Sequence, residues 1–366
     1  MLRGKAPHYY VVGDSMSYIP FFDGHNDTLT KILPQKLGQP PLFPLGTADT
    51  HVNLERAIQA HYLGSMFAIF VEPDEEEAEL CPDYMTGSNR LVMAPPMEAN
   101  DARQRTDAIM AQVLRAERQA DCPWRLVRKY EELERNMSEN KLSIVMHIEG
   151  AEAIDFELNI LEMYYQAGLR SLGLVWSRPN LFGTGVPFER PGNPDTGAGL
   201  TPAGRRLVKR CNELGIVVDM SHLNEKGFWD VAALSAAPLV VSHTAAYAMA
   251  PSARNLTDRQ LRAVAKSHGI VGLTLHVADL RPDGQYKSAR GIDYFMEHLN
   301  HIVERIGIDH VGLGSDFDGA CMPDELTEVS QLPNLLNALQ DNGFSTADIE
   351  KFAYKNWLRV LKDTWR

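Results

Sequence analysis

Histidine and carboxylate side chains recur in this chain at the ends of short apolar runs. The residues at these ends are His25 with Asp27, Glu149, His222, His243 and Asp316. Imidazole and carboxylate groups are common protein ligands of Zn²⁺ and of similar divalent cations. If the runs are neighbouring strands, the side chains that follow them would meet in one place. The pattern therefore predicts a metal centre.

Eight apolar runs of strand length could position these residues. They lie at about 20–25, 64–70, 142–149, 170–176, 215–221, 238–242, 269–276 and 310–315. Segments of helical periodicity separate most of them, as in a parallel sheet with crossover helices. We predict an α/β fold, a single-domain TIM-type (β/α)₈ barrel over residues 1–366, with the active site at the C-terminal ends of the strands. The pattern alone also permits an open doubly wound sheet.

Helix boundaries between the runs support this alternation. Thr201 and Pro202 predict the N-cap and first turn of one helix, which Gly215 ends. Thr257 and Gln260 form a capping-box pattern at the start of another. Both helices are followed directly by an apolar run, as expected of a barrel.

Two stretches interrupt the alternation. Residues 71–141 form a long insertion between the second and third runs, and we predict one long helix in it near 99–119. Residues 177–200 are rich in Gly and Pro and follow the fourth run. They are therefore expected on the active face, where such loops shape pockets or close over them. Neither stretch has the composition of a separate domain.

The number and spacing of the candidate ligands suggest two cations. His25 and Asp27 are two residues apart and would point to the same side of a strand. Glu149 ends a largely apolar run, so its carboxylate needs a cation or hydrogen bonds to offset its desolvation. With His222 and His243 these residues make five ligands, one more than a four-coordinate site uses. We predict two cations bridged by Glu149.

Each ligand also has a structural interpretation. His25 and Asp27 could form a polar strand end that caps a helix, and Glu149 could pair with a buried arginine. The histidines of the later runs, taken singly, could be hydrogen-bonded core residues. His147, two positions before Glu149, is expected to belong to the core.

Further polar residues have candidate roles around the predicted centre. Asp316 could take a proton from a metal-activated water and pass it to the leaving group. Its Gly-Ser-Asp-Phe-Asp-Gly segment, which includes Asp318, is also good turn chemistry. Asp23 and Asp219 could each fix the tautomer of a nearby histidine by accepting its second N–H. Arg254 could hold a substrate carboxylate by two hydrogen bonds, or be a surface residue.

Charge and composition narrow the partners. The formal net charge of −12 disfavours nucleic acid and anionic membrane surfaces, so we expect a small-molecule substrate. The sequence shows no signal-peptide core, membrane-length apolar run or lipid-anchor tail, and we expect no membrane association. The four cysteines are scattered, which predicts reduced thiols and a cytoplasmic location. Whether the chain forms a homodimer is left open.

Taken together, the motifs resemble those of one enzyme family. They are Asp23-Gly24-His25-Asn26-Asp27, Ile148-Glu149-Gly150, Ser221-His222, Ser242-His243-Thr244 and Gly314-Ser315-Asp316-Phe317-Asp318-Gly319. Over roughly residues 20–360 the chain resembles a soluble, bacterial-type member of the membrane (renal) dipeptidase family of zinc peptidases, peptidase family M19. The resemblance implies a (β/α)₈ barrel with two zinc ions that hydrolyses dipeptides, often with a D-amino acid at the C-terminal position.

The resemblance also implies a role for each matching residue. One zinc would be held by His25 and Asp27 and the other by His222 and His243, Glu149 would bridge them, Asp316 would shuttle the proton, and Arg254 would bind the C-terminal carboxylate. These are the residues that the spacing argument also selects.

One position departs from the family pattern. The mammalian relatives carry a histidine after the fourth strand, thought to polarise the scissile carbonyl, and this chain has Trp176 there. The indole N–H could donate one hydrogen bond to substrate, and Arg178 or Asn180 could substitute for the histidine. We expect His276, which ends the seventh run, to line the substrate pocket.

We therefore predict a dipeptidase with two Zn²⁺ per chain, in which a metal-activated bridging water attacks the peptide bond of dipeptides, including L,D-dipeptides. Two alternatives stay open: another binuclear-metal amidohydrolase or lactonase on the same barrel, and a non-catalytic metal-binding protein. Mn²⁺, Co²⁺ or Fe²⁺ could occupy the same ligands.

Overall fold

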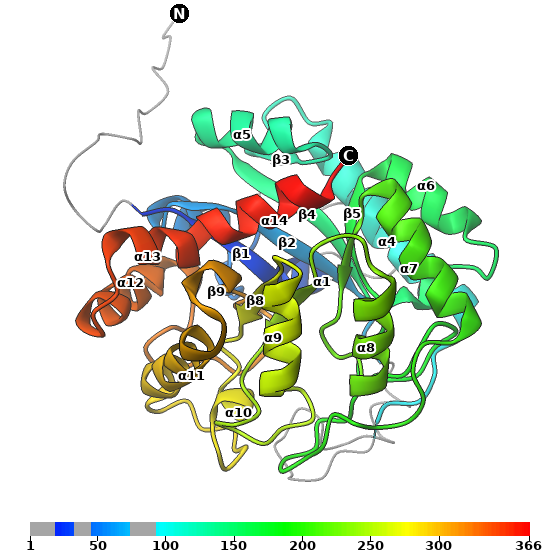
Figure 1. The fold of residues 1–366 in the computed structure, drawn as a ribbon. Coiled ribbons are helices and arrows are strands. Elements are labelled where there is room, and N and C mark those ends of the chain that lie inside the picture. The colour runs from blue at the N-terminus through cyan, green and yellow to red at the C-terminus, as the bar shows by residue number, and fades with distance from the viewer. Residues whose placement is uncertain (1–18, 33–44, 74–92) are drawn as a thin grey trace, which may run out of the picture.

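The computed structural model describes residues 19–32, 45–73 and 93–366. In these ranges one sheet of parallel strands forms the centre of the molecule (Figure 1). Its strands are β1 (Phe21–Asn26), β2 (Tyr62–Phe70), β3 (Trp124–Leu126), β4 (Leu142–Glu149), β5 (Leu169–Gly173), β6 (Val217–Asp219), β7 (Val240–Thr244), β8 (Ile270–Leu273) and β9 (Val311–Leu313). They follow the order β1-β2-β4-β5-β6-β7-β8-β9, and β3 pairs with β4 outside this path.

The end of β9 returns to β1 and closes the sheet into a barrel. Asp27 N donates a hydrogen bond to the Phe317 carbonyl at 2.8 Å, and Asp316 N donates to the His25 carbonyl at 3.1 Å. Asn26 and Phe317 form a parallel bridge. The predicted TIM-type (β/α)₈ barrel is therefore confirmed.

Helices surround the barrel, and most of them connect successive strands. They are α1 (Thr28–Ile32), α2 (Leu54–Gln59), α4 (Ala99–Glu117), α5 (Tyr130–Ser138), α6 (Asn159–Ala167), α7 (Pro202–Leu214), α8 (Glu225–Leu234), α9 (Asp258–Lys266), α10 (Val277–Leu280), α11 (Gly291–Ile306), α12 (Leu332–Asp341), α13 (Thr346–Glu350) and α14 (Asn356–Thr364). Buried apolar residues between the strands and the helices form the main core.

The helix boundaries predicted from caps are confirmed. The Thr201 hydroxyl accepts a hydrogen bond from Gly204 N at the start of α7, and Gly215 ends that helix with a left-handed φ of 73°. Thr257 and Gln260 form the predicted capping box of α9. The long helix expected near 99–119 is α4.

Each of the eight predicted runs overlaps a strand, and the short strand β3 was not predicted. It has only three residues and lies within 71–141, where so short a segment shows no alternation that could mark it. Residues 74–92 of this stretch lie outside the described ranges.

The N-terminal end of the barrel is filled by a side chain of α14. The fully buried Trp357 packs with residues from the starts of several strands, such as Phe22 and Ile270, and its Nε1 donates to the Leu313 carbonyl at 2.8 Å. A Cβ on Gly24 would lie 2.1 Å from the Trp357 ring, so the indole fits only because this position is glycine. The candidate site therefore lies at the opposite end of the barrel, where the strands have their C-terminal ends.

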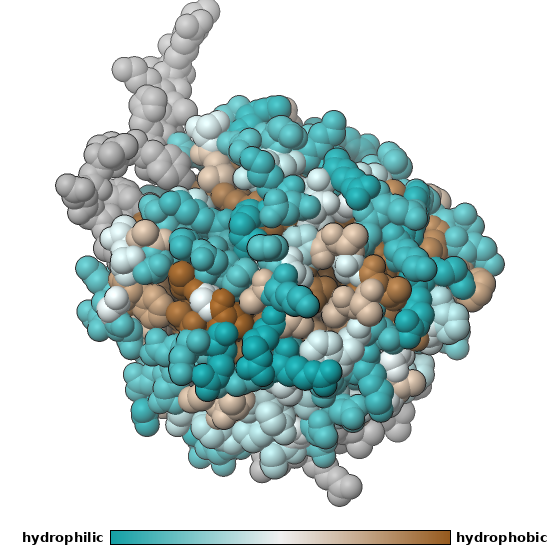
Figure 2. All heavy atoms as spheres, in the orientation of Figure 1, coloured by the Kyte–Doolittle hydropathy of each residue, from teal (hydrophilic) through white to brown (hydrophobic). Residues whose placement is uncertain are grey.

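None of the helices in the described ranges combines the length and the apolarity needed to cross a membrane. The face of the molecule in Figure 2 is mostly hydrophilic, with hydrophobic side chains visible between the helices.

Replacing Trp357 by alanine should lower the free energy of unfolding by about 3–5 kcal/mol, because it removes a fully buried ring and leaves a cavity. Urea denaturation followed by circular dichroism measures this change. Phe156→Ala is the matched control, since Phe156 is 53% exposed and its loss should cost less than about 0.5 kcal/mol. Equal stability of the two variants would show that the buried Trp357 ring does not stabilise the barrel.

Candidate metal centre

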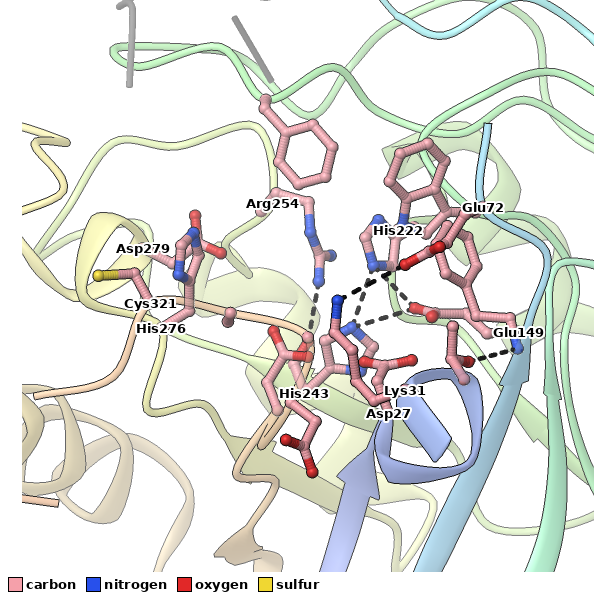
Figure 3. Close-up of a pocket in the computed structure, with 18 of the residues that line it drawn as sticks. Asp27, Lys31, Glu72, Glu149, His222, His243, Arg254, His276, Asp279 and Cys321 are labelled. Carbon is pink, nitrogen blue, oxygen red and sulfur yellow. Dashed lines mark hydrogen bonds and ion pairs between the residues drawn. The ribbon is translucent and has the colours of Figure 1, made fainter. Parts of the chain in front are cut away.

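The predicted ligands converge at the C-terminal ends of the strands. A cavity of about 380 Å³, a volume typical of small-ligand sites, is lined by four of them and by Asp316 (Figure 3). The four are Asp27, Glu149, His222 and His243. The fifth, His25, is fully buried next to them. The five side chains therefore lie close together in the structure, although they are far apart in the sequence.

One carboxylate oxygen of Glu149 lies between two histidines. Glu149 Oε1 is 3.0 Å from His222 Nε2 and 3.4 Å from His243 Nε2. The two Nε2 atoms are 3.0 Å apart. Two ligands at about 2.1 Å from one tetrahedral zinc are roughly 3.4 Å apart, so the three atoms are spaced as ligands of a single ion.

The other oxygen of Glu149 faces a second group. His25 Nε2 is 3.7 Å from Glu149 Oε2, 3.4 Å from Asp27 Oδ2 and 3.9 Å from Asp316 Oδ1. These separations exceed hydrogen-bond lengths. Among the described residues neither ring nitrogen of His25 has a hydrogen-bond partner, and Asp27 Oδ1 has none. Buried polar atoms without partners are costly, and a cation beside His25 Nε2 and the Asp27 carboxylate would satisfy those that face it.

Burial sets the electrostatics of the site. It raises the pKa of Glu149 well above its ordinary value, and burial together with the negative charge of Asp318 raises the pKa of Asp27 to about 7. Burial also lowers the pKa of His222 and of His243 well below the ordinary value. The imidazoles are thus neutral donors of lone pairs, and the carboxylates need a positive charge to ionise easily. A divalent cation meets both needs.

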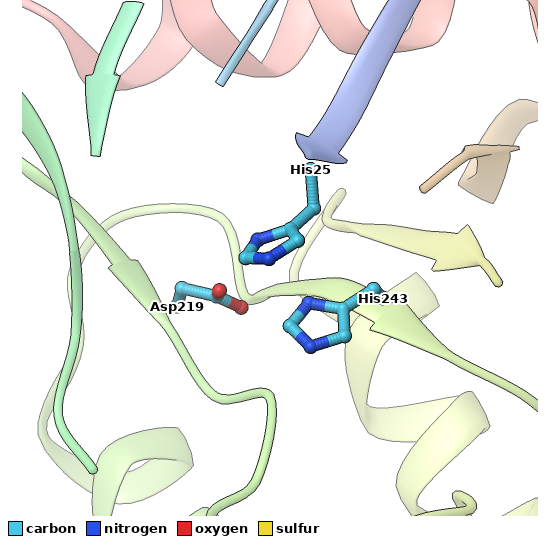
Figure 4. A group of neighbouring side chains, drawn as sticks. All are labelled: His25, Asp219 and His243. Carbon is cyan, nitrogen blue, oxygen red and sulfur yellow. The ribbon is translucent and has the colours of Figure 1, made fainter. Parts of the chain in front are cut away.

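A serine and an aspartate fix the tautomer of His243. Ser242 Oγ donates its only hydrogen to Asp219 Oδ2 at 2.5 Å, so at 2.9 Å from His243 Nδ1 it can only accept. The proton therefore sits on Nδ1, and Nε2 presents its lone pair to Glu149. Figure 4 shows Asp219 beside the rings of His25 and His243. Asp219 acts through Ser242 rather than by the direct contact that we predicted.

Asp23 also differs from the prediction. Its carboxylate accepts hydrogen bonds from the backbone N–H of His25 at 3.3 Å, from Tyr62 Oη at 2.6 Å, and from Ser315 N and Oγ at 2.8 and 2.5 Å. Asp23 therefore holds the main chain of β1 against β2 and the end of β9, and positions His25 through its backbone rather than its ring. His147, expected in the core, is fully buried, with Nδ1 2.9 Å from Ser171 Oγ.

The backbone is strained at three residues of the site. His222, Asp316 and Asp318 have φ values of 63°, 62° and 67°, a left-handed conformation that costs about 1–3 kcal/mol for a residue with a side chain. Gly319 N donates to the Asp316 carbonyl at 3.2 Å, as in the predicted turn, whereas the Asp318 carboxylate accepts hydrogen bonds from the distant His51 N and Thr28 Oγ1, each at 2.7 Å. Such strain persists only where surrounding contacts hold it.

Arg254 and His276 form another part of the pocket wall. Both are buried and line the cavity, and Arg254 Nη2 donates to the His243 carbonyl at 3.2 Å. Within the described residues, Arg254 Nε and His276 Nδ1 have no hydrogen-bond partner. Burial lowers the pKa of His276 to about 4, so its imidazole is neutral at pH 7. Two polar groups in the pocket wall thus have no partner within the described residues.

The structure does not bring Arg178 and Asn180 to the pocket. Arg178 is buried and pairs with Glu152 Oε1 at 3.2 Å. Asn180 Nδ2 donates to the Leu174 carbonyl at 2.9 Å, and its Oδ1 accepts from Phe182 N at 2.9 Å. Their polar groups stabilise the loop after β5 instead. Trp176 does line the cavity, as predicted.

Several residues of the site were missed by the sequence analysis. Ser177 Oγ lies 2.8 Å from His222 Nδ1, the same relation that Ser242 has to His243. Phe70 and Phe188 line the cavity. Ser177 and Ser242 are adjacent in sequence to predicted site residues. Serine is a common residue, however, so its position beside them does not indicate a contact with a histidine.

Ser242→Ala should weaken Zn²⁺ binding about 10- to 100-fold, because the residue that orients a histidine ligand is lost. Isothermal titration of Zn²⁺ into metal-free protein measures the affinity. Ser138→Ala, at an exposed helix end, is the control and should bind Zn²⁺ like the wild type. Unchanged affinity of Ser242→Ala would contradict the orienting role.

Comparison with known proteins agrees with this geometry. The family model described as membrane dipeptidase (peptidase family M19) matches residues 13–365. The crystal structure of a metallo peptidase from Rhodobacter sphaeroides, liganded with a phosphinate mimic of the dipeptide L-Ala-D-Ala, superposes with a TM-score of 0.89 at 42% identity and covers 95% of this chain and 99% of that chain.

Two curated relatives add to this. An uncharacterised protein encoded in the pqqA 5′ region of Klebsiella pneumoniae is 46% identical over 235 residues, 64% of this chain and 87% of its own length. Dipeptidase tcpJ of Claviceps purpurea is 29% identical over 346 residues, 93% of this chain and 76% of its own length. The chain therefore belongs to the membrane dipeptidase family, peptidase family M19, and is a metallo-dipeptidase.

Proposed function

We propose that this chain hydrolyses dipeptides, including L,D-dipeptides, with two Zn²⁺ held at the site. The observation that carries the proposal is the position of Glu149, one oxygen of which faces His222 and His243 while the other faces His25. His25 and Asp27 would hold one ion, His222 and His243 the other, and Glu149 both. The relative crystallised with a mimic of L-Ala-D-Ala supports the substrate class.

The ions and the protein would divide the chemistry between them. When bound, two divalent cations lower the pKa of a water to near neutrality and polarise the scissile carbonyl. Asp316 would accept the proton of the attacking water and deliver it to the departing amine. Burial raises the pKa of Asp316 to about 7, and bound cations nearby would lower it again, so the carboxylate would be ionised and able to accept that proton.

Arg254 would bind the C-terminal carboxylate of the dipeptide. Its guanidinium is buried in the pocket wall, and a substrate carboxylate would satisfy the Nε group that has no partner among the described residues. His276 would add a hydrogen bond from a neutral ring. Family membership favours this reaction over the lactonase, other amidohydrolase and non-catalytic alternatives.

Glu149→Gln should reduce the zinc content from two ions per chain to one or none, since the bridging charge is lost. Hydrolysis of L-Ala-D-Ala should fall at least about 100-fold, because losing even an outer-shell partner costs 10- to 100-fold. Elemental analysis and a ninhydrin assay of released alanine measure the two effects. Glu139→Gln, at an exposed position, is the matched control. Full turnover of Glu149→Gln with two bound ions would refute the bridging role.

Arg254→Met should lower kcat/KM for L-Ala-D-Ala about 10- to 100-fold, the value of a charge-assisted hydrogen bond. The C-terminal amide of the same dipeptide has no carboxylate, so its kcat/KM should be low in the wild type and change little in the variant. An equal loss on both substrates would place the arginine elsewhere in the reaction.

A further inference from the structure

One side of the cavity is aromatic. Phe70, Trp176 and Phe188 all line it, with ring centroids 4.9 Å apart for Phe70 and Trp176 and 5.6 Å apart for Trp176 and Phe188. These three residues, with Ala94, form an apolar cluster separate from the barrel core. We call Phe70, Trp176 and Phe188 the aromatic wall.

Arg178, which forms a buried ion pair with Glu152, packs against two rings of the aromatic wall. The guanidinium carbon of Arg178 lies 5.2 Å from the centroid of the Trp176 ring and 5.8 Å from that of Phe70. Arg178 is itself fixed by Glu152 and by the carbonyl of Val71, to which its Nη2 donates at 2.5 Å. Cation–π contact with a fixed guanidinium restrains both rings. The wall therefore offers a preformed apolar surface.

The strand order places Phe70 of the aromatic wall across the barrel from Arg254, whereas Phe188 lies on the side of Arg254, where Ala253 N donates to the Glu189 carbonyl at 3.3 Å. Phe70 ends β2, and Arg254 follows β7. In the order β1-β2-β4-β5-β6-β7-β8-β9, β2 and β7 are four positions apart, which is half of the closed circle of eight. Trp176 follows β5, on the same half of the barrel as Glu149 at the end of β4. A ligand anchored at Arg254 that crosses the centre reaches Phe70 and Trp176 with its other end.

We propose that Phe70 and Trp176 select dipeptides whose N-terminal residue carries a large apolar side chain, preferably an aromatic one. The inference rests on the proposed function, in which Arg254 holds the C-terminal carboxylate and the scissile bond lies at Glu149. The N-terminal residue then lies on the side of β2 and β5. An aromatic substrate side chain packs on aromatic rings better than its buried area alone would give.

This assignment gives Trp176 a different role from that of the histidine at its position in the mammalian relatives. The wall uses the face of the indole and not its N–H group. Trp176→Phe retains a ring without an N–H donor, so it separates the two roles. Selection by the ring predicts that Trp176→Phe keeps its substrate preference, whereas hydrogen bonding to the reacting carbonyl predicts a loss of kcat on every substrate.

The experiment compares Phe-Ala and Ala-Phe, which differ in the position of the aromatic ring, with Ala-Ala, which has none. Each dipeptide is tested in L,L and L,D forms with added Zn²⁺. The wild type should prefer Phe-Ala to Ala-Ala. In Trp176→Ala the ratio of kcat/KM for Phe-Ala to that for Ala-Ala should fall at least tenfold, and the ratio for Ala-Phe to Ala-Ala should stay unchanged. Phe156→Ala, an exposed aromatic outside the cavity, is the matched control and should keep all ratios.

Each other outcome has a distinct meaning. An unchanged Phe-Ala ratio in Trp176→Ala overturns the inference, and so does a fall confined to Ala-Phe, which would assign the wall to the C-terminal residue. If Trp176→Ala does not fold, Phe70→Leu tests the same wall by the same ratios. If the wild type with two bound zinc ions hydrolyses no dipeptide, the proposed function itself fails. Hydrolysis of all dipeptides without preference refutes only the aromatic wall.

Discussion

The desolvation of one carboxylate governs this site. Glu149 is buried where its charge has little water to stabilise it, and histidines face it on both sides. Its two oxygens serve two separate ligand groups. A cation bound beside the carboxylate offsets this cost, and the family to which the chain belongs is one of metallo-dipeptidases.

The residues around the ligands explain how such a costly site is kept in place. Asp219 fixes Ser242, which orients His243, and Asp23 fastens the end of β1 to its neighbours on both sides. These contacts run between adjacent strands, so the closure of the barrel and the geometry of the site depend on the same hydrogen bonds. Trp357 fills the other end, which leaves the C-terminal ends of the strands as the open one.

The cavity also has a chemical direction. Arg254 and His276 line the cavity beyond the ends of β7 and β8, and Phe70 and Trp176 line it near the ends of β2 and β5. Under the proposed function, a dipeptide with its carboxylate at one end and an apolar side chain at the other would match both.

Local patterns in the sequence determined much of this protein. Apolar runs that end in His, Asp or Glu identified the strands and the convergence of the ligands, and caps such as Thr201 identified helix starts, because these signals lie within a few residues of each other. Tertiary structure decided four other features. They are the strand β3, the hydrogen bond from Ser242 to Asp219, the orientation of Arg178 away from the cavity, and the aromatic wall. Each depends on contacts between segments far apart in the chain, and periodicity and spacing carry no information about which of many serines, arginines or phenylalanines will meet.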